Sequence, residues 1–138
     1  MGRKTLFIGL LCCMSAASAI AAEVGSADPD GTTPLHWAVR HDDLAAATAL
    51  IKAGADVNAR NRYGVTPIAL AALNGDAAMI RKLLDAGVDP NSANPNGETA
   101  LMTAARVGKL DAVKLLLDRG ATVDAKDAVH SQTALMWA

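Results

Sequence analysis

The sequence predicts an all-α solenoid, a stack of helix-turn-helix units, preceded by a signal peptide. Two short motifs recur along the chain with the same period, which is the signature of a repeat architecture. Half of the 138 residues are apolar, yet the aromatic ones are only two Trp, one Tyr and one Phe. Alanine and leucine must therefore fill the interior, as closely packed helices allow. The chain begins with basic residues, followed by an apolar run and then by small residues. This order is typical of an export signal.

The first motif places a threonine at positions 33, 66, 99 and 133, a spacing of 33, 33 and 34 residues. Its first copy is Gly31-Thr32-Thr33-Pro34-Leu35-His36-Trp37-Ala38. The second motif, Gly54-Ala55-Asp56-Val57-Asn58, recurs at 87–91 and 120–124. Two independent markers with one period predict repeated units of one kind. The expected boundaries are 1–22 for the signal peptide, 23–29 for a short lead-in, 30–62, 63–95 and 96–129 for three units, and 130–138 for the start of a truncated fourth unit.

Each unit is expected to hold two helices joined by a turn. The motif threonine can cap the first helix by accepting a backbone N–H, and Pro34 and Pro67 suit the first helical position. Glycines then end each helix in a left-handed conformation. We expect first helices at 35–41, 68–74 and 101–107, and second helices from about Leu44, Ala77 and Leu110 to just before Gly54, Gly87 and Gly120.

Apolar residues recur at helical spacing in the second helices, and we expect these rows to be core. The rows are Ala77, Ile80, Leu83 and Leu84 in one unit and Leu110, Val113, Leu116 and Leu117 in the next. No unit can bury its apolar faces alone, so stacked neighbours must supply the missing cover.

These motifs make the chain resemble the ankyrin-repeat family over residues 28–138. The matching residues are Gly31-x-Thr33-Pro34-Leu35-His36-x-Ala38, Gly54-Ala55-Asp56-Val57-Asn58 and Lys114-Leu115-Leu116-Leu117. The resemblance implies an L-shaped stack of helix pairs with β-turn fingers that project to one side. It also implies a binding role without intrinsic chemistry, and makes His36 a structural partner of the threonine hydroxyl and nearby backbone.

Some positions depart from the repeat. Asp42 stands where Gly75 and Gly108 end the first helix, and Asp tolerates the left-handed region better than most residues. The last finger, residues 127–131, carries one extra residue and lacks the turn glycine. A solenoid needs a polar end unit, and the sequence up to Ala138 offers none, so we expect an N-terminal piece of a longer array.

Residues 1–22 are expected to be a cleaved signal peptide. Arg3 and Lys4 form its basic start, an apolar core covers 5–14, and cleavage is expected after residue 21 or 22. Cleavage would lower the formal charge from −1 to −3 and remove both cysteines, Cys12 and Cys13. We therefore expect an exported protein, periplasmic or secreted, with no stable membrane insertion after cleavage.

Two other interpretations of this segment stay open. An uncleaved anchor would need a longer apolar run than the Ser/Ala-rich second half provides. A lipoprotein would need a small residue just before its cysteine, and leucines stand there instead.

The sequence offers no catalytic or metal-binding constellation, so we expect a non-catalytic protein without a cofactor. His41, Asp42 and Asp43 are consecutive and point in different directions on a helix. Residues 28–31 lack the further oxygen ligands of a calcium loop. Charges of both signs alternate, as in residues 81–85, which argues against a nucleic-acid surface.

The resemblance implies that finger tips and the inward edge of the first helices bind a protein partner. Carried over residue by residue, the candidates are Asp30, Thr32, Arg40, His41, Arg62, Tyr63, Val65, Asn74, Asn96, Glu98, Arg106 and His130. Arg62 and Tyr63 stand out because Arg and Tyr dominate interface energetics. Trp37 occupies a position repeated as Leu70, Thr103 and Trp137, and is expected to pack between units. His130 lies in the irregular last finger and is expected to be exposed.

The leading hypothesis is a monomeric, exported interaction scaffold. One alternative is the recognition arm of a larger exported enzyme or receptor whose active domain lies beyond Ala138. A purely structural or inhibitory role is a second alternative. A small-molecule binder is weaker, because Ala-rich helix pairs leave no large cavity.

Overall fold

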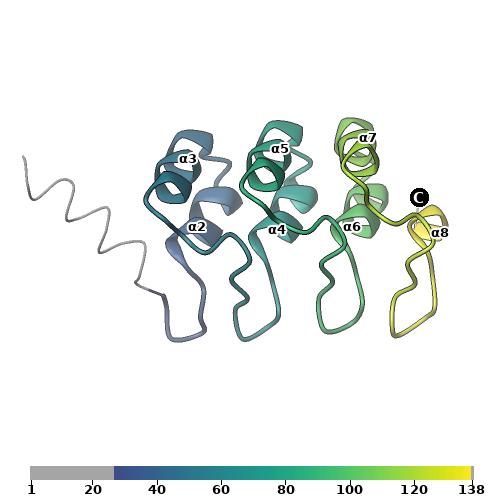
Figure 1. Ribbon diagram of the computed structural model, residues 1–138. Helices are drawn as coiled ribbons and strands as arrows, with labels where there is room; N and C mark the ends of the chain where they lie inside the picture. The colour runs from purple at the N-terminus through teal and green to yellow at the C-terminus, as the bar shows by residue number, and fades with distance from the viewer. Residues whose placement is uncertain (1–26, 138) are drawn as a thin grey trace, which may run out of the picture.

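The computed structural model describes residues 27–137, which form a stack of helix pairs (Figure 1). The helices are α2 (Pro34–Arg40), α3 (Leu44–Lys52), α4 (Pro67–Asn74), α5 (Ala77–Asp85), α6 (Ala100–Val107), α7 (Leu110–Asp118) and α8 (Ala134–Trp137). The first helices α2, α4, α6 and α8 form one layer, and the second helices α3, α5 and α7 form the other (Figure 1). Long loops project from the first layer as fingers. The predicted all-α solenoid is confirmed, whereas the expected signal peptide lies outside the described residues.

The motif threonines begin the first helices as predicted. Thr33, Thr66 and Thr99 have extended backbones, and each side chain accepts a hydrogen bond from the N–H three residues later at 3.4 Å. Pro34 and Pro67 are the first helical residues, as predicted, so the helices include one residue before the expected ranges 35–41 and 68–74. A proline in this place loses no hydrogen bond, because the first N–H groups of a helix have no partner within it.

The first helices end in left-handed turns. Gly75 and Gly108 have φ of 73° and 76°, and Asp42 adopts the same conformation with φ of 60°. In the last finger Ser131 has φ of 53°, in the place that Gly97 takes one unit earlier. At both positions a residue with a β-carbon thus takes the left-handed conformation that glycine has in the equivalent place, which strains the turn.

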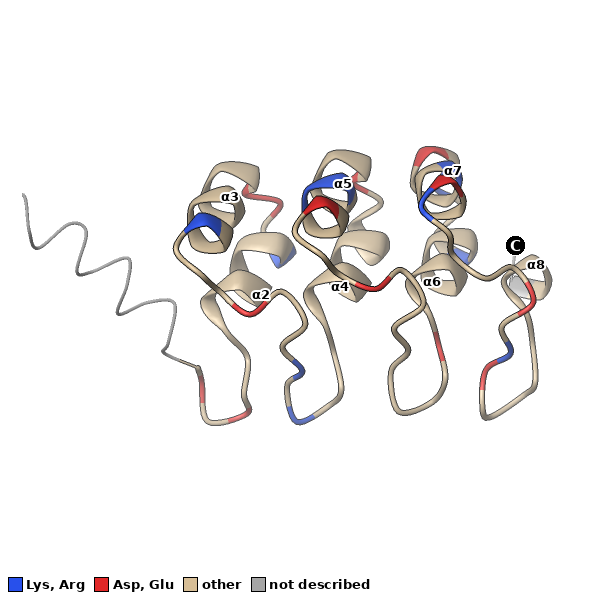
Figure 2. Cartoon of the chain, viewed as in Figure 1, with Lys and Arg blue, Asp and Glu red and all other residues tan. Residues whose placement is uncertain are grey.

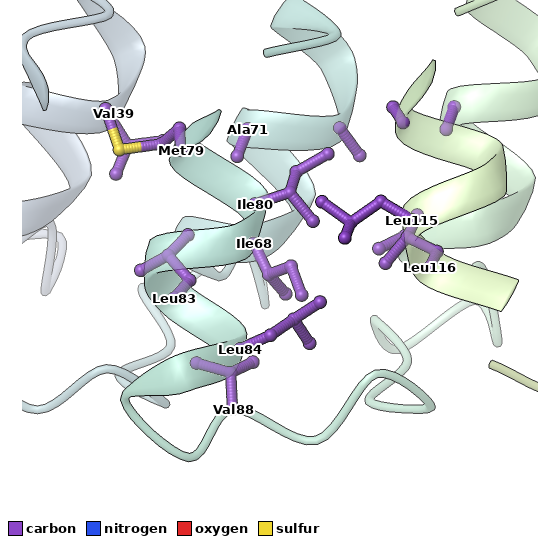
Figure 3. Packing of buried hydrophobic residues seen from close by; sticks show 14 of the residues in the cluster. Val39, Ile68, Ala71, Met79, Ile80, Leu83, Leu84, Val88, Leu115 and Leu116 are labelled. Atoms are coloured by element: carbon purple, nitrogen blue, oxygen red, sulfur yellow. The ribbon is translucent and has the colours of Figure 1, made fainter. Parts of the chain in front are cut away.

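A continuous apolar core runs between the two layers and from unit to unit. Met79 of α5 lies beside Val39 of the first unit, whereas Ile80 points toward α7 (Figure 3). Both side chains of α5 are fully buried, as is Leu116 of α7. Alanines on the first helices, such as Ala71, are buried and let neighbouring helices come close together.

The expectation that the whole apolar row of the third unit is core is wrong. Leu116 is buried, but Leu110 is 62 % exposed and Leu117 is 40 % exposed. The equivalent of Leu117 one unit earlier, Leu84, is only 9 % exposed because α7 packs against α5. Within residues 27–137 no further second helix packs in the same way against α7.

Among the described residues, no helix is both long and apolar enough to cross a membrane.

The turn at Asp42 generates a stability prediction. Asp42→Gly should raise the melting temperature at pH 7 by about 4 °C, because a left-handed residue with a β-carbon costs about 1 kcal/mol. The exchange also removes a contact between the two acidic side chains of Asp42 and Asp76. In the native chain the pKa of Asp42 is raised, first by a hydrogen bond with the Asp76 carboxyl, then by burial and by repulsion from Asp76. Thermal unfolding at low ionic strength measures both effects.

The pH dependence of this variant follows from the direction of the pKa shift. Since the folded protein favours protonated Asp42, the native chain loses stability as pH rises through the raised pKa and regains it on acidification. The advantage of Asp42→Gly should therefore shrink as pH falls toward the ordinary Asp value of 3.8. The control Asp42→Asn removes the charge and keeps the β-carbon, so it should gain less. A glycine variant no more stable than the native chain at pH 7 would contradict the assignment of strain.

Candidate partner-binding surface

Each later finger is held in shape by an Asn or Asp side chain at its base. The Oδ1 atom of Asn61 accepts hydrogen bonds from the N–H groups of Tyr63 at 3.0 Å and Val65 at 2.9 Å. Asn94 does the same for Asn96 and Glu98, both at 2.9 Å. Such side-chain-capped turns fix the backbone of the tip, so the exposed residues are presented in a set arrangement.

Neighbouring fingers are joined by backbone hydrogen bonds. The N–H of Arg62 donates to the carbonyl of Asp30 at 2.6 Å, and the N–H of Ala128 donates to that of Asn96 at 2.7 Å. Pro95 holds the equivalent place between the second and third fingers and has no N–H. It packs instead against Gly64, so closely that a β-carbon there would lie 2.2 Å from its Cδ atom.

His36 joins the first unit to the second finger, as the family resemblance implied. Its ring is buried, Nε2 lies 2.9 Å from the carbonyl oxygen of Val65, and Nδ1 lies 2.8 Å from the hydroxyl of Thr33. Because a carbonyl can only accept, Nε2 carries the proton and Nδ1 is the acceptor. The same Nδ1 also accepts the N–H of Thr33 at 3.2 Å, which closes a capping box.

A hollow of about 240 Å³ lies between the first two fingers and the helix above them, and we call it the finger hollow. Its lining includes several of the predicted binding residues, namely Asp30, Thr32, Arg40, Tyr63 and Val65. Tyr63 is 66 % exposed and stands at its edge. The hydrogen bonds that Thr32 donates to the Asp30 carboxylate, first from its N–H and then from its hydroxyl, lower the pKa of Asp30. This carboxylate is therefore ionised at neutral pH.

Trp37 forms another wall of the finger hollow, and the sequence interpretation missed it. Its indole N–H donates to the Asp28 carboxylate at 2.8 Å, the Arg40 guanidinium lies 5.5 Å from its ring centroid, and the His41 ring stacks at 5.9 Å. The side chain is 42 % exposed, and its hydrogen-bonding and ring partners come from residues 28–41. It lines the hollow together with Val65 and Leu70 of the next unit, and the expectation that it packs between units stays a prediction.

The remaining candidates lie elsewhere on the surface. Asn96, Glu98 and His130 line a smaller hollow of about 120 Å³ between the third and last fingers. Arg106 forms a salt bridge with Glu98 at 3.3 Å. The guanidinium of Arg62 reaches the carbonyl of Pro29 at 3.3 Å, at the edge of the first finger. His130 is exposed, as predicted.

Asn74 has a structural role in addition to any role in binding. Its side-chain amide donates to the carbonyl of Val39 at 2.9 Å and to that of Arg40 at 3.4 Å. These carbonyls lie in the last turn of α2, and that of Val39 also accepts the N–H of Asp42 at 3.1 Å. Asn74 therefore ties the end of α4 to the end of α2.

Charges of both signs are interspersed over the fingers and the second helices (Figure 2). The described residues contain no group of three or more His, Cys, Asp or Glu side chains placed to hold a metal ion. The geometry thus presents a mixed polar and aromatic surface on preformed fingers.

Comparison with known families agrees with this geometry. A family model described as ankyrin repeats (3 copies) matches residues 10–94 and 68–138. The chain therefore belongs to the ankyrin-repeat family, whose repeats are in general non-catalytic modules for protein–protein interaction. A search of curated proteins returned no match.

The hydrogen bonds of Asn74 predict a stability effect. Asn74→Ala should lower the free energy of unfolding by about 1 kcal/mol, because it leaves the end of α2 without its amide donor. Asn96→Ala is the matched control: its side chain is exposed at a finger tip, and its removal should change stability by less than about 0.5 kcal/mol. Urea unfolding followed by circular dichroism compares the two. Equal midpoints for both variants would refute the structural role.

Proposed function

We propose that this chain is a non-catalytic scaffold that binds a protein partner with the finger hollow as the centre of the interface. The observation that carries the proposal is the meeting of Trp37, Arg40 and Tyr63 around one hollow. Trp, Arg and Tyr are the residue types most enriched among the side chains that dominate binding energy.

The surroundings of these three side chains favour binding with little rearrangement. The Trp37 ring is held by a hydrogen bond to Asp28 on one edge and by the Arg40 guanidinium that lies over it. The backbone that carries Tyr63 is fixed by Asn61. Anchors that are already ordered lose less conformational entropy when a partner binds.

The size of the hollow favours a side chain of a partner over a free small molecule. Its volume of about 240 Å³ lies below the roughly 300–1,000 Å³ that small-molecule sites span. A hollow of this size, open between fingers, accommodates one bulky side chain from a larger surface. The other finger tips then contribute the rim of the interface.

The proposal is tested by capture from the envelope fraction of cells that express the chain. Three baits are compared after chemical cross-linking. They are the native chain, the double variant Trp37→Ala with Tyr63→Ala, and the control Arg81→Ala. Since hot-spot side chains contribute about 2 kcal/mol or more each, recovery of a true partner should fall more than about tenfold with the double variant. Quantitative mass spectrometry measures recovery, and circular dichroism checks that the helices are intact.

Arg81 is a matched control because it is exposed on α5, in the layer of second helices away from the fingers. Its replacement should leave recovery unchanged. If every captured protein is recovered equally with the double variant, the finger hollow is not the interface.

We also propose that the chain is exported, to the periplasm or beyond, through cleavage of residues 1–22. Support comes from the order of Arg3 and Lys4, an apolar run and small residues before Glu23. The intact mass of the protein from the envelope fraction should start at residue 22 or 23. As a control, Leu10→Arg with Leu11→Arg breaks the apolar run and should leave the full-length chain inside the cell. A native mass that retains Met1 in the envelope would instead indicate an anchor.

A further inference from the structure

The sequence contains two Asn-Gly dipeptides, Asn74-Gly75 at the end of α4 and Asn96-Gly97 at the tip of the third finger. An asparagine that precedes glycine is prone to lose its side-chain amide, because the glycine has no side chain to shield its main-chain nitrogen. That nitrogen can attack the carbonyl carbon of the asparagine side chain. The rate of this reaction depends on how firmly the fold holds the attacking nitrogen and the amide apart.

The fold holds both reacting groups at Asn74. Its side-chain amide donates to the carbonyls of Val39 at 2.9 Å and Arg40 at 3.4 Å. The N–H of Gly75 donates to two carbonyls in the last turn of α4, at 2.9 Å and 3.1 Å. The reaction at this site therefore requires that the end of α4 opens and that its link to α2 breaks.

The side chain of Asn96, in contrast, is exposed at a finger tip. Within residues 27–137 no hydrogen bond engages its side-chain amide, and only the main chain of the tip is held. The N–H of Asn96 donates to the Oδ1 atom of Asn94, and the N–H of Gly97 donates to the main-chain carbonyl of Asn94, both at 2.9 Å. An exposed turn opens more readily than a helix end that is packed in the core, so the amide can reach the Gly97 nitrogen.

We propose that Asn96 is a site of spontaneous deamidation, and that its conversion to isoaspartate separates the third finger from the last. The Gly97 nitrogen bonds to the side-chain carbonyl carbon of Asn96, and the bond from that carbon to the amide nitrogen breaks. Ammonia leaves with the proton of the Gly97 N–H, and a five-membered succinimide remains. Water then opens the ring. Attack at the former side-chain carbonyl gives aspartate, and attack at the main-chain carbonyl gives isoaspartate.

The aspartate product fits the finger, because the first finger already carries Asp-Gly in the same place. The main-chain carbonyl of Asp30 accepts the N–H of Arg62 at 2.6 Å, as that of Asn96 accepts the N–H of Ala128 at 2.7 Å. The glycines that follow Asp30 and Asn96 have φ of 81° and 77°. Conversion to aspartate therefore adds one negative charge and leaves the path of the main chain unchanged.

Isoaspartate does not fit, because its main chain runs through the former side chain and gains one carbon. The carbonyl that accepts the N–H of Ala128 becomes a free carboxylate on a branch. The Oδ1 atom of Asn94 binds the N–H groups of residues 96 and 98, both at 2.9 Å, and the added carbon changes their spacing. Gly97 has no room for a longer main chain, since even a β-carbon there would lie 2.7 Å from the nitrogen of Ala128.

The modification thus changes the hollow of about 120 Å³ between the third and last fingers, which Asn96 lines. The finger hollow lies between the first two fingers and keeps its shape. The inference does not rest on the proposed function, because it concerns the chemistry of one dipeptide and the link between two fingers.

The native chain is tested after incubation at slightly alkaline pH, both folded and unfolded in urea. Trypsin cleaves after Arg and Lys, so Asn74 lies in the peptide 63–81 and Asn96 in the peptide 83–106. Mass spectrometry with electron-transfer fragmentation locates the new acid and distinguishes aspartate from isoaspartate. In the folded chain Asn96 should convert at least about tenfold faster than Asn74, whose amide must first break its hydrogen bonds. In urea the two sites should convert at similar rates.

Asn96→Gln is the matched control, because its longer side chain would have to form a six-membered ring, which closes far more slowly. It keeps an amide at the finger tip and should show no conversion at position 96. Equal rates at Asn74 and Asn96 in the folded chain would overturn the proposal, and so would conversion of Asn96 only after unfolding.

The separation of the fingers is measured by hydrogen exchange of the Ala128 N–H, followed by nuclear magnetic resonance. Anion exchange isolates the aged chain, and peptide mapping identifies the fractions that carry isoaspartate. Exchange at Ala128 should be at least about tenfold faster in these fractions than in the native chain. Asn96→Asp supplies the charge without the added carbon and should keep native protection. Native protection of Ala128 in the isoaspartate form would show that the fingers stay joined and overturn this part of the proposal.

Discussion

Stacking between successive units is the constraint on which this structure depends, because a pair of short helices cannot bury its own apolar surface. The α5 helix shows the point most directly: Met79 packs toward the first unit and Ile80 toward the third, and both are fully buried. Helices of seven to nine residues are too short to be stable alone in water. Their stability therefore comes from neighbours on both sides, and it is shared along the stack.

The fingers owe their order to the same stacking. A constant offset between units brings equivalent turn residues side by side, so that Arg62 can donate to Asp30 and Ala128 to Asn96. The His36 ring extends this coupling from the helix layer to the second finger through Val65. The packing of the helices thus determines the distance between finger tips. The shape of the finger hollow therefore depends on core contacts that lie well away from it.

Much of the fold could be predicted from the sequence because its determinants are local. A capping threonine, a proline at the first helical position and a glycine with positive φ act within a few residues, and the 33-residue period places them. Burial is different, since it depends on whether a neighbour is present. The sequence pattern of Leu117 equals that of Leu84, and only the packing of α7 on α5 separates a core residue from an exposed one.

Trp37 shows a further limit of sequence interpretation at the candidate site. An aromatic residue on a helix is usually assigned to the core, yet the hydrogen bond to Asp28 and the Arg40 guanidinium over the ring give this indole a polar environment. Arg40 lies three residues along the helix, where side chains are expected to meet, but Asp28 lies nine residues away in the first finger, and no spacing rule identifies it as a partner. Tyr63, in contrast, could be found from its finger position, because a tip residue stays exposed whatever the neighbouring units do.

The finger hollow and the apolar surface beside α7 and α8 differ in chemistry, and each therefore suits a different kind of contact. The finger hollow mixes aromatic rings with charged and amide groups that remain hydrated when nothing is bound, as at interfaces that form and dissociate. The hollow of about 290 Å³ beside α7 and α8 is lined mostly by leucine, valine and alanine, and in composition it resembles the core between α5 and α7. Interfaces of that composition are typical of permanent association. The finger hollow therefore suits a contact that forms and dissociates, whereas exposed leucine and valine on one face mark a surface that is stable only when it is covered.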